Sequence, residues 1–155
     1  MRQGIATVAA IGVLAAVPAV AFADSSTYKG EGVGDPEATI ELKITNGDER
    51  RVKKVIAKGI AYDVAGGCSG SGRTPKATLR GNFKVNENSG KFRAVGGAET
   101  NDPLTDGELK VVGYAGRNRV MGRMQFTFGK DGCKSEPALY KALRLATPAR
   151  SVRGR

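Results

Sequence analysis

The stretch TIELKIT at residues 39–45, followed by an Asn-Gly dipeptide, decides the fold. Ile40, Leu42 and Ile44 alternate with polar residues, which is the period-two pattern of a strand with one buried face. Asn-Gly tolerates the positive φ angles of a tight hairpin turn. The pattern therefore predicts a strand, a hairpin turn and a return strand over residues 51–64.

The return strand is irregular. Val52 and Val55 fall on opposite phases, so we predict a bulge or bend between them. Beyond the bulge, four apolar side chains are expected to share a face: Ile56, Ile60, Tyr62 and Val64. A loop rich in Gly, Ser and Pro then covers residues 66–76.

Further short strands follow, separated by Gly, Asn and Asp turns. The expected strands lie at residues 77–85, from residue 92 onward, at 108–115 and at 120–128, and polar loops separate them. On the segment 120–128 the expected inward residues are Val120, Gly122, Met124, Phe126 and Phe128. This spacing predicts an all-β fold, an antiparallel up-and-down β-barrel or β-sandwich of about 7–9 strands.

The segment 138–146 fits two structures. Leu139, Leu143 and Leu145 alternate as in a closing strand, whereas Ser135-Glu136-Pro137 is typical of a helix start. We favour the strand because the sheet needs a last partner.

The two ends of the chain differ from the middle. Residues 1–23 begin with the basic Arg2, continue as an uncharged apolar run and end in Ala21-Phe22-Ala23. This pattern predicts a cleaved signal peptide, with a retained membrane anchor as the alternative. Residues 24–146 are then a single β domain, residues 147–155 a disordered basic tail, and the mature protein is secreted, extracytoplasmic and without a membrane span.

The chain has two cysteines, Cys68 and Cys133. Exported chains meet oxidising conditions, so an intramolecular disulfide is expected, with free thiols or an intermolecular bond as alternatives. Each cysteine follows a glycine, which places both near strand ends.

The composition excludes several kinds of catalysis. The chain has no histidine, which removes Ser-His-Asp triads, Cys-His pairs and imidazole acid–base chemistry. We expect no cofactor and no metal, although Asn101, Asp102, Asp106 and Glu108 could supply oxygen ligands to calcium without the regular spacing of a calcium loop. The Gly-rich stretch 66–72 lacks the Lys and the helix of a phosphate loop.

The chain has a formal net charge of +10, and its basic residues cluster in the sequence. Such a charge favours anionic partners, here a wall polymer or a lipid surface. Nucleic acid is not expected, because the aromatic residues fall mostly in the core phase. The candidate contacts, in two groups, are Arg51, Lys53, Lys54 and Lys58, and Arg117, Arg119 and Arg123.

Several short motifs occur together along the chain: Tyr28-Lys29-Gly30 at its start, Gly90-Lys91-Phe92 in the middle, and Gly122-x-Met-x-Phe leading through a glycine turn to Cys133. Their layout resembles a group of small secreted β domains of high-GC Gram-positive bacteria, mostly of unassigned function. The resemblance spans residues 28–144 and implies an all-β fold, the disulfide and a location in the cell envelope.

Three functions follow as hypotheses. The first is a non-enzymatic envelope domain that binds an anionic wall polymer or surface. The second is a small barrel with an apolar ligand inside, lined by Phe83, Phe92, Met124, Phe126 and Phe128. The third is a hydrolase with two carboxylates, drawn from Glu37, Glu41, Asp63, Glu99, Asp102, Asp106 and Glu108.

Overall fold

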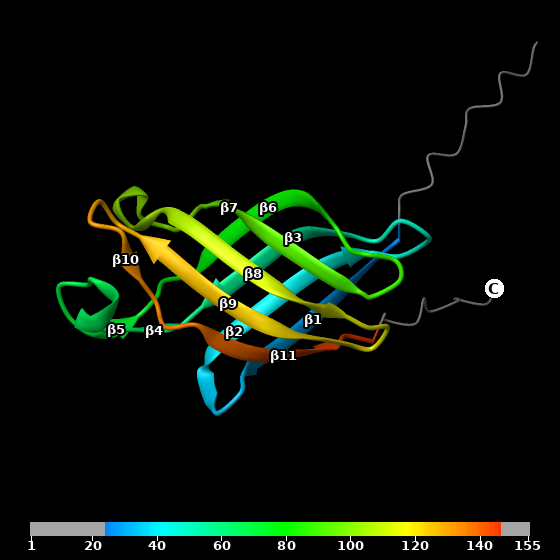
Figure 1. The fold of residues 1–155 in the computed structure, drawn as a ribbon, viewed down its shortest axis with the longest axis horizontal. Coiled ribbons are helices and arrows are strands. Elements are labelled where there is room, and N and C mark those ends of the chain that lie inside the picture. Colours follow the sequence, from blue (N-terminus) through cyan, green and yellow to red (C-terminus); the bar gives the residue numbers. More distant parts are fainter. Residues whose placement is uncertain (1–23, 147–155) are drawn as a thin grey trace, which may run out of the picture.

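A computed structural model describes residues 24–146 of the chain (Figure 1). The predicted signal peptide and basic tail lie outside these residues. Most of the described chain is strand, with two single-turn 3-10 helices, η1 at Val64–Gly66 and η2 at Pro103–Thr105. No helix among the described residues is long and apolar enough to cross a membrane.

Eight antiparallel strands form one sheet in the order β6-β3-β2-β1-β11-β9-β8-β7. They are β1 (Ser25–Gly32), β2 (Asp35–Thr45), β3 (Arg51–Lys58), β6 (Ala77–Lys84), β7 (Lys91–Ala98), β8 (Gly107–Ala115), β9 (Arg119–Phe128) and β11 (Ala138–Arg144). The short strand β10 (Cys133–Lys134) pairs with β9, and β4 (Ala61–Tyr62) pairs with β5 (Gly72–Arg73).

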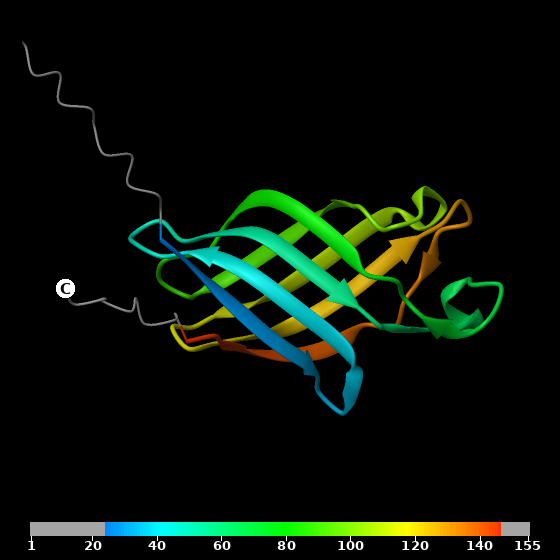
Figure 2. The same ribbon diagram turned by 180° about the vertical axis from the view of Figure 1, so that it is seen from behind.

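The sheet curls into a nearly closed barrel (Figures 1 and 2). Its end strands β6 and β7 meet along a seam that two isolated bridges hold, Thr78 with Glu99 and Val85 with Phe92. The inner faces of all eight strands supply one apolar core. The prediction of an all-β antiparallel fold is confirmed, in the form of one barrel-like sheet and not of two packed sheets.

The irregularity of β3 is a bulge, as predicted. The register shifts beside Lys53 on both sides of β3, so Val52 and Val55 are both buried while Lys53 and Lys54 stay on the outer surface. The expected face beyond the bulge is wrong except for Ile60, which is buried. Ala57 points inward in place of Ile56, and Val64 is exposed, because β3 ends at Lys58 and the chain turns at Gly59 with a positive φ.

The last segment is a strand, as favoured, but its phase is opposite to that of the leucines. Tyr140 and Ala142 are fully buried, whereas Leu139 and Leu143 are more than half exposed. The reason lies on the neighbouring strands. Gly113 and Gly122 face each other across β8 and β9, and a Cβ on either glycine would come within 3 Å of the Tyr140 hydroxyl oxygen.

The Tyr140 ring thus covers two glycines and fixes the phase of β11. Its hydroxyl is buried and has no hydrogen-bond partner in the described part of the chain. Burial also raises the pKa of Tyr140, so the phenol is neutral at any physiological pH.

We predict that Tyr140→Phe stabilises the protein by about 1 kcal/mol, because it removes a buried hydroxyl without a partner and keeps the ring. Urea denaturation measures the change. Gly122→Ala is the opposite control: its Cβ would collide with the Val112 carbonyl oxygen, so it should lower stability. A loss of stability in Tyr140→Phe would mean that the hydroxyl has a partner.

The expected disulfide between Cys68 and Cys133 is present. It joins the loop between β4 and β5 to β10, at the same end of the barrel (Figure 1). A backbone hydrogen bond from Glu136 to Ala61 adds a second tie between the same two regions. The bridge therefore fixes the segment that precedes β11 to the β4–β5 loop that follows β3.

We predict that Cys68→Ser with Cys133→Ser lowers stability by about 2–4 kcal/mol, since the bridge closes a long loop. Hydrogen exchange should rise first in β4, β5 and β10, and later in β2 and β9. Uniform exchange over the whole sheet would contradict this local role. Each single serine variant leaves one thiol and serves as a control for oxidation between molecules.

The opposite end of the barrel is tied by an arginine. Arg50 donates through Nη1 to the Ala115 carbonyl at 2.8 Å and through Nη2 to the Gly116 carbonyl at 3.0 Å. The Tyr28 hydroxyl donates to the Arg117 carbonyl beside it at 3.1 Å. Arg50 therefore joins the β2–β3 turn to the β8–β9 turn, and this cation belongs to the fold.

Candidate functional site

The outer face of β3 is basic because of the bulge. Without the extra residue, Lys53 and Lys54 would point to opposite sides of the sheet. With it, both project outward while the core keeps Val52 and Val55. The Lys53 ammonium donates to the Asn82 side chain on β6 at 2.8 Å, which leaves Lys54 at the centre of the face.

Three cations stand directly opposite one another around Lys54. Lys43 of β2 pairs with Lys54 in register, and Lys54 pairs with Arg80 of β6. Cβ atoms of opposed residues lie about 4.5–5.5 Å apart, and like charges in this position destabilise a sheet. The fold thus tolerates an unfavourable row of three positive charges.

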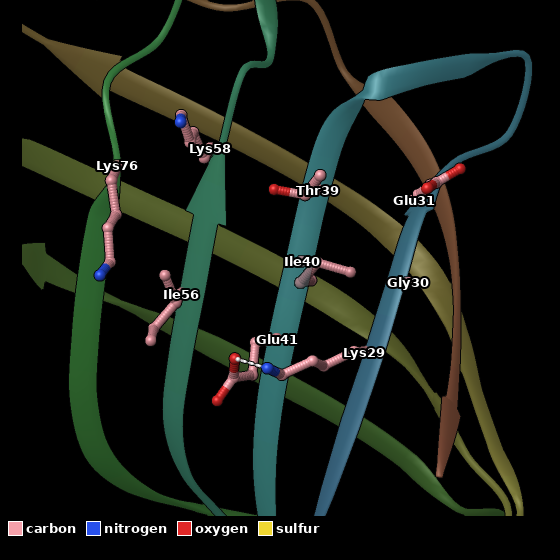
Figure 3. A pocket seen from close by; sticks show the side chains of 9 residues that line it. All are labelled: Lys29, Gly30, Glu31, Thr39, Ile40, Glu41, Ile56, Lys58 and Lys76. Carbon is pink, nitrogen blue, oxygen red and sulfur yellow. Dashed lines mark ion pairs between the residues drawn. The ribbon is translucent and has the colours of Figure 1, made fainter. Parts of the chain in front are cut away.

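Two further pairs of cations extend this row along β3 and β6. At one end, Arg51 is in register with Lys84. At the other end, Lys58 and Lys76 line the same open hollow, where Figure 3 shows their side chains on neighbouring segments. We name the surface formed by all these residues the basic track: Lys43, Arg51, Lys53, Lys54, Lys58, Lys76, Arg80 and Lys84.

The hollow at the Lys58 end has a volume of about 470 Å³. Ile56 and Thr39 line it, and the ion pair between Lys29 and Glu41, at 3.2 Å, borders it (Figure 3). The hollow therefore combines three ammonium groups with apolar side chains and a hydroxyl. Two carboxylates also line it: Glu41 is paired with Lys29, whereas Glu31 forms no ion pair with a described residue.

Several carboxylates near the basic track form ion pairs. Asp35 and Glu37 both pair with Arg73, at 2.6 and 2.9 Å, and Arg73 lowers the pKa of Asp35. Glu49 pairs with Arg51 at 3.5 Å, at the edge of the track. Of the described residues, none places a carboxylate oxygen within 4 Å of the cationic groups of Lys43, Lys54 or Arg80.

The two predicted groups of basic residues do not form one surface. Arg51, Lys53, Lys54 and Lys58 lie on the basic track. Arg119 and Arg123 lie on β9, four strands away from β3 in either direction around the sheet, and Arg117 lies in the β8–β9 turn. Sequence reasoning missed four members of the track because only strand register brings them together: Lys43, Lys76, Arg80 and Lys84.

Three of the seven candidate catalytic carboxylates serve local structure. Of the others, Glu37 and Glu41 form ion pairs, and Glu99 and Glu108 are exposed. Asp63 accepts hydrogen bonds from the backbone at the start of η1, and Asp102 does so at η2. Asp106 accepts from the Thr100 backbone at 2.7 Å. Within residues 24–146, no group of three or more Asp, Glu, His or Cys side chains is placed to hold a metal ion.

The residues proposed to line an apolar pocket belong to the core. Phe92, Met124 and Phe126 are buried, and the partly buried Phe83 and Phe128 pack against them. Phe128 lies at the end of β9, where its ring packs against the core, stacked on Phe126 and in edge contact with Tyr62.

Comparison with known proteins gives no relative. No family model, no curated protein and no solved structure matches the chain. The function must therefore be argued from the surface itself.

We predict that Lys54→Glu stabilises the protein by about 1 kcal/mol at low salt. The change replaces two repulsive neighbours, Lys43 and Arg80, by two attractive ones. The gain should shrink in about 1 M salt, where charges are screened. Lys110→Glu is the matched control, because its neighbours in register are the uncharged Val95 and Gln125. Equal effects in the two variants would show that the row is not strained.

Proposed function

We propose that this protein is a non-enzymatic binding domain of the cell envelope, whose basic track holds a linear polyanion such as a phosphate-bearing wall polymer. One observation carries the proposal: Lys43, Lys54 and Arg80 face one another without a carboxylate within 4 Å. A bound anion would turn this repulsion into attraction.

The shape of the track favours a linear partner. Each cation pair has one member on or just before β6, and these members recur every four residues, at Lys76, Arg80 and Lys84. Four residues of a strand span about 13 Å, so the whole track is about 26 Å long. A single phosphate reaches one pair, whereas an extended polymer reaches all three and gains affinity from each.

The flanks of the track favour binding along the strands. Glu41 on β2 and Glu99 across the seam lie to either side of the row formed by Ile56 and Thr78. Glu41 is paired with Lys29, so Glu99, which forms no ion pair with a described residue, is the carboxylate that repels a polyanion crossing the sheet. Neither β3 nor β6 contains an acidic residue. A chain of negative charge is therefore guided parallel to β3.

An extracytoplasmic setting agrees with this proposal. The disulfide between Cys68 and Cys133 is the kind of bond that persists in oxidising compartments. The basic charge favours retention on an anionic polymer outside the cell.

The test is binding of the purified protein to poly(glycerol phosphate), measured by calorimetry at several salt concentrations. We predict that Lys43→Gln with Lys54→Gln and Arg80→Gln weakens binding about tenfold or more at low salt. Each lost contact should reduce the slope of log affinity against log salt by roughly 1, by analogy with nucleic-acid phosphates.

The matched control is Lys110→Gln with Lys130→Gln and Lys134→Gln, which removes the same charge from exposed positions away from the track. It should keep nearly full affinity. An equal loss in both variants would assign binding to net charge alone, and no binding by the unaltered protein would overturn the proposal.

A further inference from the structure

The wall opposite the basic track exposes an unusual number of apolar side chains. Tyr114, Met121, Leu139 and Leu143 are 54%, 43%, 53% and 55% exposed. They come from β8, β9 and β11, and register places them together: Met121 is opposite Tyr114 on one side and Lys141 on the other. Clustered exposed apolar residues mark interaction sites more often than isolated ones do.

Cations alternate with these side chains. Arg123 stands between Val112 and Leu139 in register, and Arg119 is opposite Leu143. Neither β9 nor β11 contains an acidic residue. We name this surface the amphiphilic wall: Tyr114, Met121, Leu139 and Leu143 with Arg119, Arg123 and Lys141.

We propose that the amphiphilic wall docks on an anionic lipid bilayer. Interfacial binding combines apolar side chains that enter the headgroup region with cations that meet lipid phosphates. The wall offers both on one outward face, and its charge complements that of the lipid. This inference concerns a second site and does not rest on polyanion binding by the basic track.

Another copy of this chain is a poorer occupant. Two identical walls meeting about a twofold axis would bring Arg119, Arg123 and Lys141 of both copies together. Neither β9 nor β11 supplies an acidic residue, and Glu31 of β1, in register with Lys141, is a single carboxylate at the edge of the wall. A bilayer with anionic headgroups removes this repulsion.

The absence of tryptophan from the chain allows a direct test. Leu139→Trp places a single indole on the amphiphilic wall, and Ile56→Trp places one on the opposite wall. With vesicles of phosphatidylglycerol and phosphatidylcholine, we predict a blue shift and quenching by brominated lipid for Leu139→Trp alone. A response from Ile56→Trp alone, or from neither, would overturn the proposal.

A second variant separates insertion from charge attraction. Met121→Ser with Leu143→Ser keeps every charge and should weaken vesicle binding about tenfold at physiological salt, since it removes apolar area from the contact. An unchanged far-UV circular dichroism spectrum and unfolding midpoint show that the variant is folded. Unchanged vesicle binding, or self-association that the two substitutions abolish, would contradict docking on lipid.

Discussion

The structure depends on the contact between the Tyr140 ring and the glycine pair Gly113–Gly122. β11 lies between β1 and β9, so its ladders join the strands from the first part of the domain to those from the last, and the β6–β7 seam with its two isolated bridges is the other junction. Its seven residues have two possible phases. If Leu139 and Leu143 pointed inward, the Tyr140 ring would be exposed to water and the space beside the two glycines would be less well filled. The tyrosine fills that space, and the leucines are left outside as a direct consequence.

The bulge in β3 has a similar double effect. It keeps Val52 and Val55 in the core and turns two consecutive lysines to the surface. The core explains why Lys53 and Lys54 lie outside, but it does not explain why their neighbours are also basic. Lys43 and Arg80 occupy outward positions where Thr or Glu would serve a strand as well or better. The stability of the sheet therefore does not explain why Lys43 and Arg80 are basic.

Most of the strands could be predicted from the sequence because alternation and glycine turns are local signals. The bulge could be predicted too, since two valines in opposite phases both need burial. The phase of β11 could not, because leucine is more apolar than tyrosine and two leucines share the opposite phase, while the glycines that decide the phase lie on other strands. Only part of the basic track could be predicted from the sequence. The basic residues of β3 are adjacent in the chain, but Lys43, Arg80 and Lys84 join them only through strand register.

The two surfaces lie on opposite walls of one sheet: their central strands, β3 and β9, are four strands apart, and β1 and β7 separate the surfaces at their edges. The barrel separates the two surfaces, so one small ligand cannot contact both at once. Each surface therefore needs its own partner. If the amphiphilic wall rests on a membrane, β3 and β6 face away from it, with Lys54 at the centre of the side turned to the surrounding polymer. The geometry then suits a domain that holds a polyanion close to, and parallel with, the lipid surface.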